Sequence, residues 1–333
     1  MSRDAVGHRR AARMLAARAL ALVMGFAAIA TTTAQDYPSK PIKLLVPFAA
    51  GSGQDLRARQ VAGLLAQRLG QPIVVDNRPG ADGAIGTALG ARAKPDGYTL
   101  VFCNSGTLAV NPALMPDLGY DPIRDLVPIV RLVLSSGVVA VGAASDVRSL
   151  PQLLALARSR PGALRYGSGS AYAHMLGQLL SRRAGVDWVY VPYRGDAQVL
   201  ADLIGGHIDL MLSFPIVLLP QARAGQVRIL AVAGPHRMPA MPEVPTVAEL
   251  GLKNSELRAW AGLCTQAGTP AEVVSRISRE TLVAILAPAV KAEVESQGYE
   301  VTPNTPGEFL AFVKADMART AALVRELGVS ADH

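Results

Sequence analysis

The chain has 333 residues but only two cysteines and 5% aromatic residues. The cysteines, Cys103 and Cys264, are too far apart in the sequence to form a metal-binding motif. In an oxidising compartment they could form one disulfide, but both lie in apolar strand-like stretches, TLVFCNS and WAGLCTQ, which favour two buried free thiols. We therefore expect no metal, and the sequence leaves the pairing open.

The sequence also lacks a basic run of the kind that nucleic acid requires. The formal net charge is +7, from 33 Lys and Arg against 26 Asp and Glu. Residues 1–34 contain five Arg and one Asp, so the rest of the chain has 28 basic and 25 acidic residues. The positive charge is therefore concentrated at the N-terminus, and we expect no nucleic acid partner.

After residue 34 no segment is long and apolar enough to cross a bilayer. Before it, five arginines precede the uncharged stretch 19–30, and Thr32 and Ala34 occupy the −3 and −1 positions of a cut after Ala34. This order is typical of a secretory signal peptide, whereas a membrane anchor would need more than about a dozen apolar residues. We expect a soluble protein exported to the periplasm.

Strand and helix patterns alternate after residue 34, which favours an α/β fold with largely parallel sheets. Two strand patterns, 127–136 and 137–143, follow each other without a helix, and the extended segment 257–270 leads back to the first series. We expect a signal peptide over 1–34, a first domain over 35–136 and 262–333, and a second domain inserted over 137–261. Ligands of such proteins bind between domains, at the carboxyl ends of strands.

The turn AAGSGQD, residues 49–55, joins an apolar strand pattern to an amphipathic helix pattern. It does not match the dinucleotide-binding motif, because Leu56 occupies the position of the third glycine. It does not match a Walker loop either, because the required G-K-[ST] is absent. Gly51 and Gly53 still let backbone N–H groups approach a ligand, and the helix behind directs its positive end there. The turn can bind a carboxylate, and we expect no cofactor.

Three more polar turns follow predicted strands and offer hydroxyl, amide and backbone donors. Arg194 is the one cation in them; it could clamp a second carboxylate, pair with Asp196 or remain a solvated charge. The candidate ligand-binding residues are Phe48, Ala49, Gly51, Ser52, Gly53, Gln54, Asp55, Ser105, Thr107, Asn111, Ser168, Gly169, Ser170, Tyr172, Tyr193, Arg194 and Gly195.

A hydrolytic alternative would use Ser168 or Ser170 as nucleophile and His174 as base. GSGSA lacks the second glycine of a nucleophile elbow, and His174 falls on a helix face where a core or capping histidine is more common. We expect no catalytic residue.

Nearly the whole chain after residue 34 resembles the Bug family, named for Bordetella uptake genes. These proteins are the extracytoplasmic solute receptors of tripartite tricarboxylate transporters. The matching stretches include AAGSGQDLRARQVAGLLAQRLGQPIVVDNRPG, YDPIRDLVPI, VPYRGDAQVLADLIGGHIDLML and MPEVPTVAELG. The resemblance implies a periplasmic-binding-protein type II fold with two domains, two crossing segments and an interdomain cleft for a small organic anion. It also implies that the turns above hold a carboxylate, without catalysis.

The sequence departs from the family pattern at several of these turns. Ser52 and Gly53 replace the second glycine and the hydroxyl residue of the family's first turn, whereas Asp55 is kept. Leu108 replaces a histidine, and LSF after IDLM replaces a common acidic residue. Because these changes make the site more apolar, we hypothesise a monocarboxylate with an apolar or aromatic body, beside Leu108, Tyr172 and Phe214.

The expected function is capture of a mono- or dicarboxylate by closure of two domains, as a monomer that delivers its ligand to membrane transporter subunits. A periplasmic sensor that signals to a receptor, and a secreted hydrolase, are the alternatives.

Overall fold

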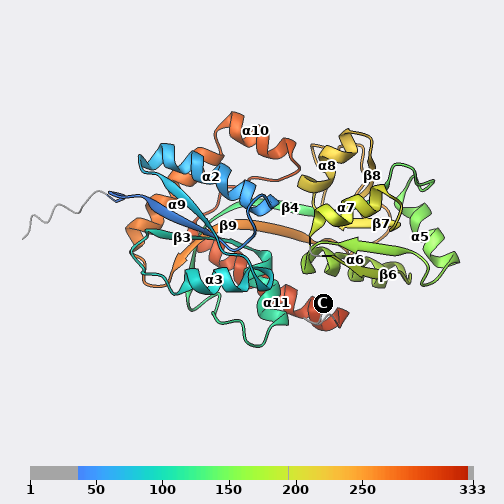
Figure 1. Ribbon diagram of the computed structural model, residues 1–333, viewed down its shortest axis with the longest axis horizontal. Helices are drawn as coiled ribbons and strands as arrows, with labels where there is room; N and C mark the ends of the chain where they lie inside the picture. The colour runs from blue at the N-terminus through green and yellow to red at the C-terminus, as the bar shows by residue number, and fades with distance from the viewer. Residues whose placement is uncertain (1–36, 194, 329–333) are drawn as a thin grey trace, which may run out of the picture. The chain divides into compact units, whose positions relative to one another are not determined.

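The computed structural model describes residues 37–193 and 195–328 (Figure 1). The chain divides into two units, 1–39 and 40–333. Of the first unit only 37–39 are described, with a cis peptide bond between Tyr37 and Pro38. The expected signal peptide over 1–34 and the side chain of Arg194 lie outside the described residues. Within the described ranges, no helix combines the length and the apolar character that a membrane span requires.

The described strands of the second unit form one sheet in the order β2-β1-β3-β9-β4-β7-β5-β6, with β8 pairing with β4. Two parallel groups, β2-β1-β3 and β6-β5-β7, are joined through the antiparallel strands β4 and β9. This mixed arrangement confirms the predicted α/β fold. The strands are β1 (Ile42–Val46), β2 (Ile73–Asn77), β3 (Thr99–Asn104), β4 (Leu126–Gly142), β5 (Arg165–Ser168), β6 (Val189–Pro192), β7 (Leu210–Ser213), β8 (Val227–Ala233) and β9 (Arg258–Gln266).

Strand β4 runs between the two groups of strands and changes partners along its length. Up to Ser136 it pairs with β9, and from Gly137 it pairs with β8 and β7 (Figure 1). The expectation of two separate strands over 127–143 is therefore wrong, because the chain continues straight while its partners change. The change of partner falls at the expected crossing near Ser136 and Gly137, and the division into two domains stays a prediction.

Two of the helical segments lie directly at the predicted polar turns. Helix α6 begins at Ala171, because Ser170 caps it by accepting the N–H of Ala173. The turn after β3 is itself helical over 106–114. Glu300 forms an isolated bridge with Leu134 of β4. The helices are α2 (Gly53–Leu69), η1 (Ala81–Gly83), α3 (Ala84–Ala91), η2 (Gly106–Val110), α4 (Asn111–Leu114), α5 (Leu150–Ser159), α6 (Ala171–Ala184), α7 (Asp196–Ile204), α8 (Pro215–Arg223), α9 (Ala271–Ile285), α10 (Pro288–Ser296) and α11 (Pro306–Leu327).

The apolar core lies on both faces of the sheet. Because side chains alternate along a strand, Val139 and Val141 of β4 enter one cluster, whereas Val138 and Ala140 enter another on the opposite face. A third cluster lies between β3, β9 and α11 and contains both cysteines. Each face of β4 is thus covered, which explains why its sequence is apolar throughout.

Cys103 and Cys264 form a disulfide between β3 and β9, with their Cα atoms 6.1 Å apart. The two strands are antiparallel neighbours, and Cys103 lies opposite Gly262, two residues from Cys264. The interpretation of two free thiols is therefore wrong, because the strand register brings the cysteines within reach of each other.

Candidate functional site

The turn between β1 and α2 is built on local hydrogen bonds. Gly51 has a φ of +79°, a left-handed conformation that favours glycine, and its N–H donates to Oδ2 of Asp55 at 2.8 Å. Ser52 caps α2, because its Oγ accepts the N–H of Asp55 at 3.3 Å. Helix geometry leaves the first N–H groups, those of Gly53 and Gln54, without a partner in the helix. These two donors are available to an anion.

Asp55 holds this turn in place through hydrogen bonds of its side chain. Its side chain is 1% exposed and accepts hydrogen bonds from Nε of Arg59 at 3.0 Å and Nδ2 of Asn77 at 2.8 Å. Asn77 also donates to the carbonyl of Phe48, which ties the turn to β2. Burial raises the pKa of the Asp55 carboxyl, but the donors Arg59, Gly51 and Asn77 outweigh it and hold that pKa below its usual value. Its oxygens are thus occupied by the protein.

The predicted residues after β3 are buried and form hydrogen bonds within their own turn and with neighbouring segments. The Oγ1 of Thr107 accepts the N–H of Asn104 at 3.1 Å, and the Thr107 carbonyl accepts the hydroxyl of Tyr120. Asn111 donates from Nδ2 to the carbonyl of Asp82 at 3.1 Å. Ser105 accepts the N–H of Trp260 at 3.4 Å. These side chains position the turn against β9 and η1.

The turn after β5 is likewise organised from within. Ser168 is fully buried and its hydroxyl donates to the carbonyl of Ser170 at 3.4 Å, while the Oγ of Ser170 caps α6. Tyr172 is 6% exposed; its hydroxyl donates to the carbonyl of Arg258 at 2.7 Å and its ring lies 6.0 Å from that of Phe214. Tyr172 therefore connects α6 to the start of β9.

Helix α7 begins with Asp196, which the sequence suggests only as a possible partner for Arg194. The Asp196 carboxylate accepts the hydroxyl of Ser213 at 3.1 Å and the N–H of Gly169. Burial raises the pKa of this carboxyl, and the two donors only partly offset that effect. Its position directly after the strand and turn VPYRG was the signal that could have marked it.

Two of the predicted polar turns, those after β5 and β6, meet the turn after β7 at one edge of the sheet. Because β6 and β7 both run parallel to β5, the carboxyl ends of the three strands lie together, and α6, α7 and α8 begin there. Gly195 is the residue before α7, and Tyr193 bends back along that helix to donate its hydroxyl to Asp202 at 2.6 Å.

The turn before α2 also lies near this edge. A Cβ at Gly53 would be 3.7 Å from Cγ2 of Ile216, in the first turn of α8. Ala49 and Gly51 are exposed, whereas Ser52 and Gln54 are partly buried. The first turns of α2 and α8 therefore face each other at contact distance. Ser105 of the turn after β3 and Tyr172 of α6 both bond to the start of β9, at Trp260 and Arg258.

The residues proposed for hydrolysis are part of the core. His174 is 3% exposed, its Nδ1 shares a hydrogen bond with the Tyr166 hydroxyl at 2.9 Å, and its ring lies 3.8 Å from that of Tyr190. Together with the burial of Ser168, this arrangement gives the hydrolase alternative no support. Among the described residues, no three His, Cys, Asp or Glu side chains gather as a metal site.

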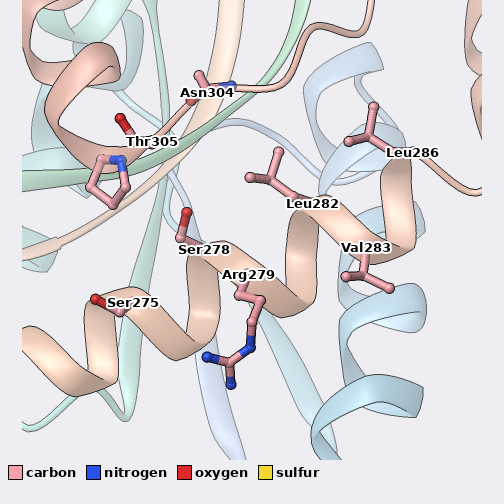
Figure 2. A pocket seen from close by; sticks show the side chains of 9 residues that line it. Ser275, Ser278, Arg279, Leu282, Val283, Leu286, Asn304 and Thr305 are labelled. Carbon is pink, nitrogen blue, oxygen red and sulfur yellow. The ribbon is translucent and has the colours of Figure 1, made fainter.

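The chain also has a surface pocket of about 390 Å³ that contains none of the predicted site residues. Its walls are mostly apolar and come from α9 and the residues that precede and begin α11. Figure 2 shows Ser278 and Leu282 on the side of α9 that faces Thr305 and Asn304. The pocket therefore lies outside the polar turns described above.

Comparison with known proteins places these observations in a family. The family model of the tripartite tricarboxylate transporter family receptor matches residues 57–329. A protein of Pseudomonas sp. (strain P51), named for the tcbD-tcbE intergenic region, is 35% identical over 98% of this chain and 97% of its own. Protein BugT of Bordetella pertussis is 33% identical over 90% and 93%.

Solved structures agree with the sequence relatives. A protein described as a periplasmic transporter is 38% identical, with a TM-score of 0.83 over 89% of this chain and all of that one. R. palustris Rpa4515 with adipate is 30% identical, with a TM-score of 0.84 over 89% and 99%. MatC from Rhodopseudomonas palustris with bound malate is 28% identical, with a TM-score of 0.77 over 86% and 100%. The chain therefore belongs to the tripartite tricarboxylate transporter receptor family of periplasmic solute-binding proteins.

Proposed function

We propose that this chain is exported to the periplasm, binds a small organic carboxylate and delivers it, as a monomer, to the membrane subunits of a tripartite transporter. The observation that carries the proposal is the start of α2, where the N–H groups of Gly53 and Gln54 are free of helix partners. The positive end of a 17-residue helix favours an anion at the same place. The adipate and malate bound to the relatives' structures are both small carboxylates, which supports this assignment.

The ligand would lie between the two groups of strands, where the turns before α2, α6, α7 and α8 converge. The residues of the turns 48–55, 104–111, 168–170 and 193–195 surround it in this proposal, with Asp55 and Tyr172 as positioning residues. A ligand that contacts both groups of strands stabilises the closed arrangement, because only in that arrangement can it contact both groups at once. The crossing strands β4 and β9 are the only strand connections between the groups among the described residues, and they would carry the motion. The proposed function requires no chemical reaction of the ligand.

The proposal is tested by uptake. A strain that lacks the gene is supplied with isotope-labelled organic acids, singly, and accumulation is compared with that of a strain complemented with the wild-type gene. The proposal predicts one or more acids whose accumulation requires the gene, and the protein in the periplasmic fraction without residues 1–34. If the purified protein binds an acid whose uptake is independent of the gene, the transport role is wrong and a sensor role is favoured.

A further inference from the structure

Arg57 is a buried arginine of α2, one helical turn after Gly53. It is 4% exposed, and its guanidinium lies over the ring of Tyr299, 4.2 Å from the ring centroid. Its Nη2 donates to Oε1 of Gln297 at 2.7 Å, and its Nη1 donates to Oε1 of Gln60. Arg57 therefore attaches the chain at 297–299, between α10 and α11, to α2.

The shape of arginine explains how one side chain makes these contacts together. The guanidinium is planar, so its face can stack on an aromatic ring while its edge donates several hydrogen bonds in fixed directions. Both acceptors are amide oxygens, of Gln60 and Gln297, and the contacts with them fix a position rather than neutralise a charge. Arg57 thus determines where the residues around Tyr299 lie relative to α2.

The segment 296–300, part of which Arg57 holds, also contacts the other side of the proposed ligand position. Helix α8 follows β7 of the second group of strands, and its last residue, Arg223, donates from Nη2 to the carbonyl of Ser296 at 3.0 Å. In the loop after β8, Nε2 of His236 lies 3.3 Å from Oε1 of Glu300. The segment 296–300 therefore bridges α2 to α8 and to the loop after β8.

The start of α8 packs closely against the middle of this segment. A Cβ at Gly298 would lie 2.4 Å from Cβ of Pro215, so glycine is needed for this approach. The next residue of α8, Ile216, is the one that faces Gly53 at the start of α2. The first turn of α8 is thus positioned both by α2 itself and by the segment that Arg57 attaches to α2.

These contacts connect Arg57 to the closure of the two groups of strands. The contacts of segment 296–300 with α8 and His236 would be lost if α8 moved away from α2, so they favour the closed arrangement without a ligand. A ligand that binds only the closed arrangement has an apparent Kd equal to its intrinsic Kd divided by the closed fraction. A residue that raises the closed fraction therefore raises the affinity.

We propose that Arg57 is a positioning residue for ligand binding, which holds the segment 296–300 in place as a contact surface for α8 and so favours the closed arrangement. This inference rests on the proposed function and adds to it a residue outside the turns that surround the ligand. Arg57 acts through Gln297 and Tyr299 and does not need to contact the ligand.

Small-angle X-ray scattering of the ligand-free protein without residues 1–34 tests the inference, because opening increases the radius of gyration. Arg57→Met, which keeps an unbranched side chain, should have a larger radius than wild type. Tyr299→Leu and Arg223→Met remove contacts on the two sides of the segment and should act in the same direction. Because both act through one segment, combining Arg57→Met with Arg223→Met should increase the radius by less than the sum of the single effects.

Arg68→Met is the matched control, since Arg68 lies in the last turn of the same helix and pairs with Glu280 of α9 at 2.8 Å. Its radius of gyration should equal that of wild type. Wild-type radii for folded Arg57→Met and Tyr299→Leu would overturn the inference. An equal increase for Arg68→Met would overturn it too, because the effect would then not depend on the segment 296–300. If Arg57→Met does not fold, Tyr299→Leu and Arg223→Met decide by the same comparison.

Calorimetric titration with adipate, with malate and with each acid that the uptake test identifies gives the second readout. An acid that binds the wild type should bind Arg57→Met about threefold to tenfold more weakly, and Arg68→Met within about twofold of wild type. Equal affinity of Arg57→Met and wild type would overturn the inference while the proposed function stands. If no organic acid binds the wild type, the proposed function is wrong, and the scattering of the ligand-free proteins still decides whether Arg57 sets their arrangement.

Discussion

The Oδ2 atom of Asp55 accepts the backbone N–H of Gly51 at 2.8 Å, across the turn that joins β1 to α2. The same oxygen is paired with Arg59, and Oδ1 is bonded to Asn77. The negative charge of Asp55 is therefore compensated locally, so that an acidic residue can organise an anion-binding turn without repelling the anion. Because the N–H groups of Gly53 and Gln54 follow directly, the bond also determines where those donors point.

The Gly53 N–H can be removed without disturbing the helix. Proline is well tolerated at the first position of a helix, and Ser52 has the extended conformation, φ −69° and ψ 159°, that a following proline requires. Gly53→Pro should therefore leave the melting temperature unchanged or slightly raised. It should weaken carboxylate binding about tenfold to a hundredfold, the effect of losing a hydrogen bond to a charged group. Titration calorimetry and thermal unfolding measure the two effects.

Gly53→Ala is the control for the added side chain. Its Cβ would be in ordinary contact with Ile216 at 3.7 Å and the N–H would remain, so affinity should stay within about threefold of wild type. Equal affinities of the proline and alanine variants would show that this N–H does not bind the ligand.

Asp55→Asn should destabilise the protein by about 2 kcal/mol at pH 7, because an amide would present N–H groups to donors and lose the pairing with Arg59. The folded state holds the pKa of Asp55 below its usual 3.8. The stabilisation is therefore fully present above 3.8 and is lost as pH falls through the lowered pKa. Urea unfolding between pH 7 and pH 3 should show the wild-type advantage constant at first and shrinking below 3.8.

Asp76 supplies a control of equal charge on the neighbouring strand β2. It pairs with Lys43 and Arg78, both of which are about half exposed. Asp76→Asn should cost less than about 1 kcal/mol, as expected for surface ion pairs. A larger loss for Asp76→Asn than for Asp55→Asn would contradict the role given to Asp55.

The disulfide closes a long segment, since 161 residues separate Cys103 from Cys264. Replacing both cysteines by alanine should lower the free energy of unfolding by about 2–5 kcal/mol. Because both sulfur atoms are in the bond, an alkylating reagent should label neither cysteine after the protein from an oxidising compartment is unfolded without reductant. Two labelled thiols in that sample would mean that the bond is absent.

Tyr172→Phe separates a positioning role from ligand contact. Loss of the hydrogen bond to the Arg258 carbonyl should destabilise the protein by about 1 kcal/mol. Because the side chain is buried, carboxylate affinity should change by less than about threefold. The opposite pattern, a large loss of affinity with unchanged stability, would place Tyr172 in contact with the ligand.

The features that the sequence predicts well are those with local causes. The turn before α2 follows from glycine at a left-handed position and from Ser52 at the helix cap, and both are visible in AAGSGQD. The start of α5 has equally local causes, because Ser149 caps it and Pro151 lies in its first turn. These signals depend on neighbours within four residues.

The features that the sequence predicts poorly depend on residues far away in the chain. Gly137 resembles a break between two strands, but glycine is needed there because a Cβ would lie 2.5 Å from Cδ2 of Leu176. The disulfide depends on the register of β3 against β9, and the hydrogen bond of Asp196 depends on Ser213, which belongs to another turn. Neither the contact of Gly137 nor the pairing of the cysteines leaves a pattern in the adjacent sequence.

The measurement that tests the central claim most directly compares organic acids with their primary amides. Each pair has the same carbon skeleton, and only the acid carries the charge that the start of α2 is proposed to bind. Calorimetric titration of the wild-type protein should show saturable, one-to-one binding of at least one acid and at least tenfold weaker binding of its amide. Equal affinity for an acid and its amide would contradict the account, because the site would then not recognise a carboxylate.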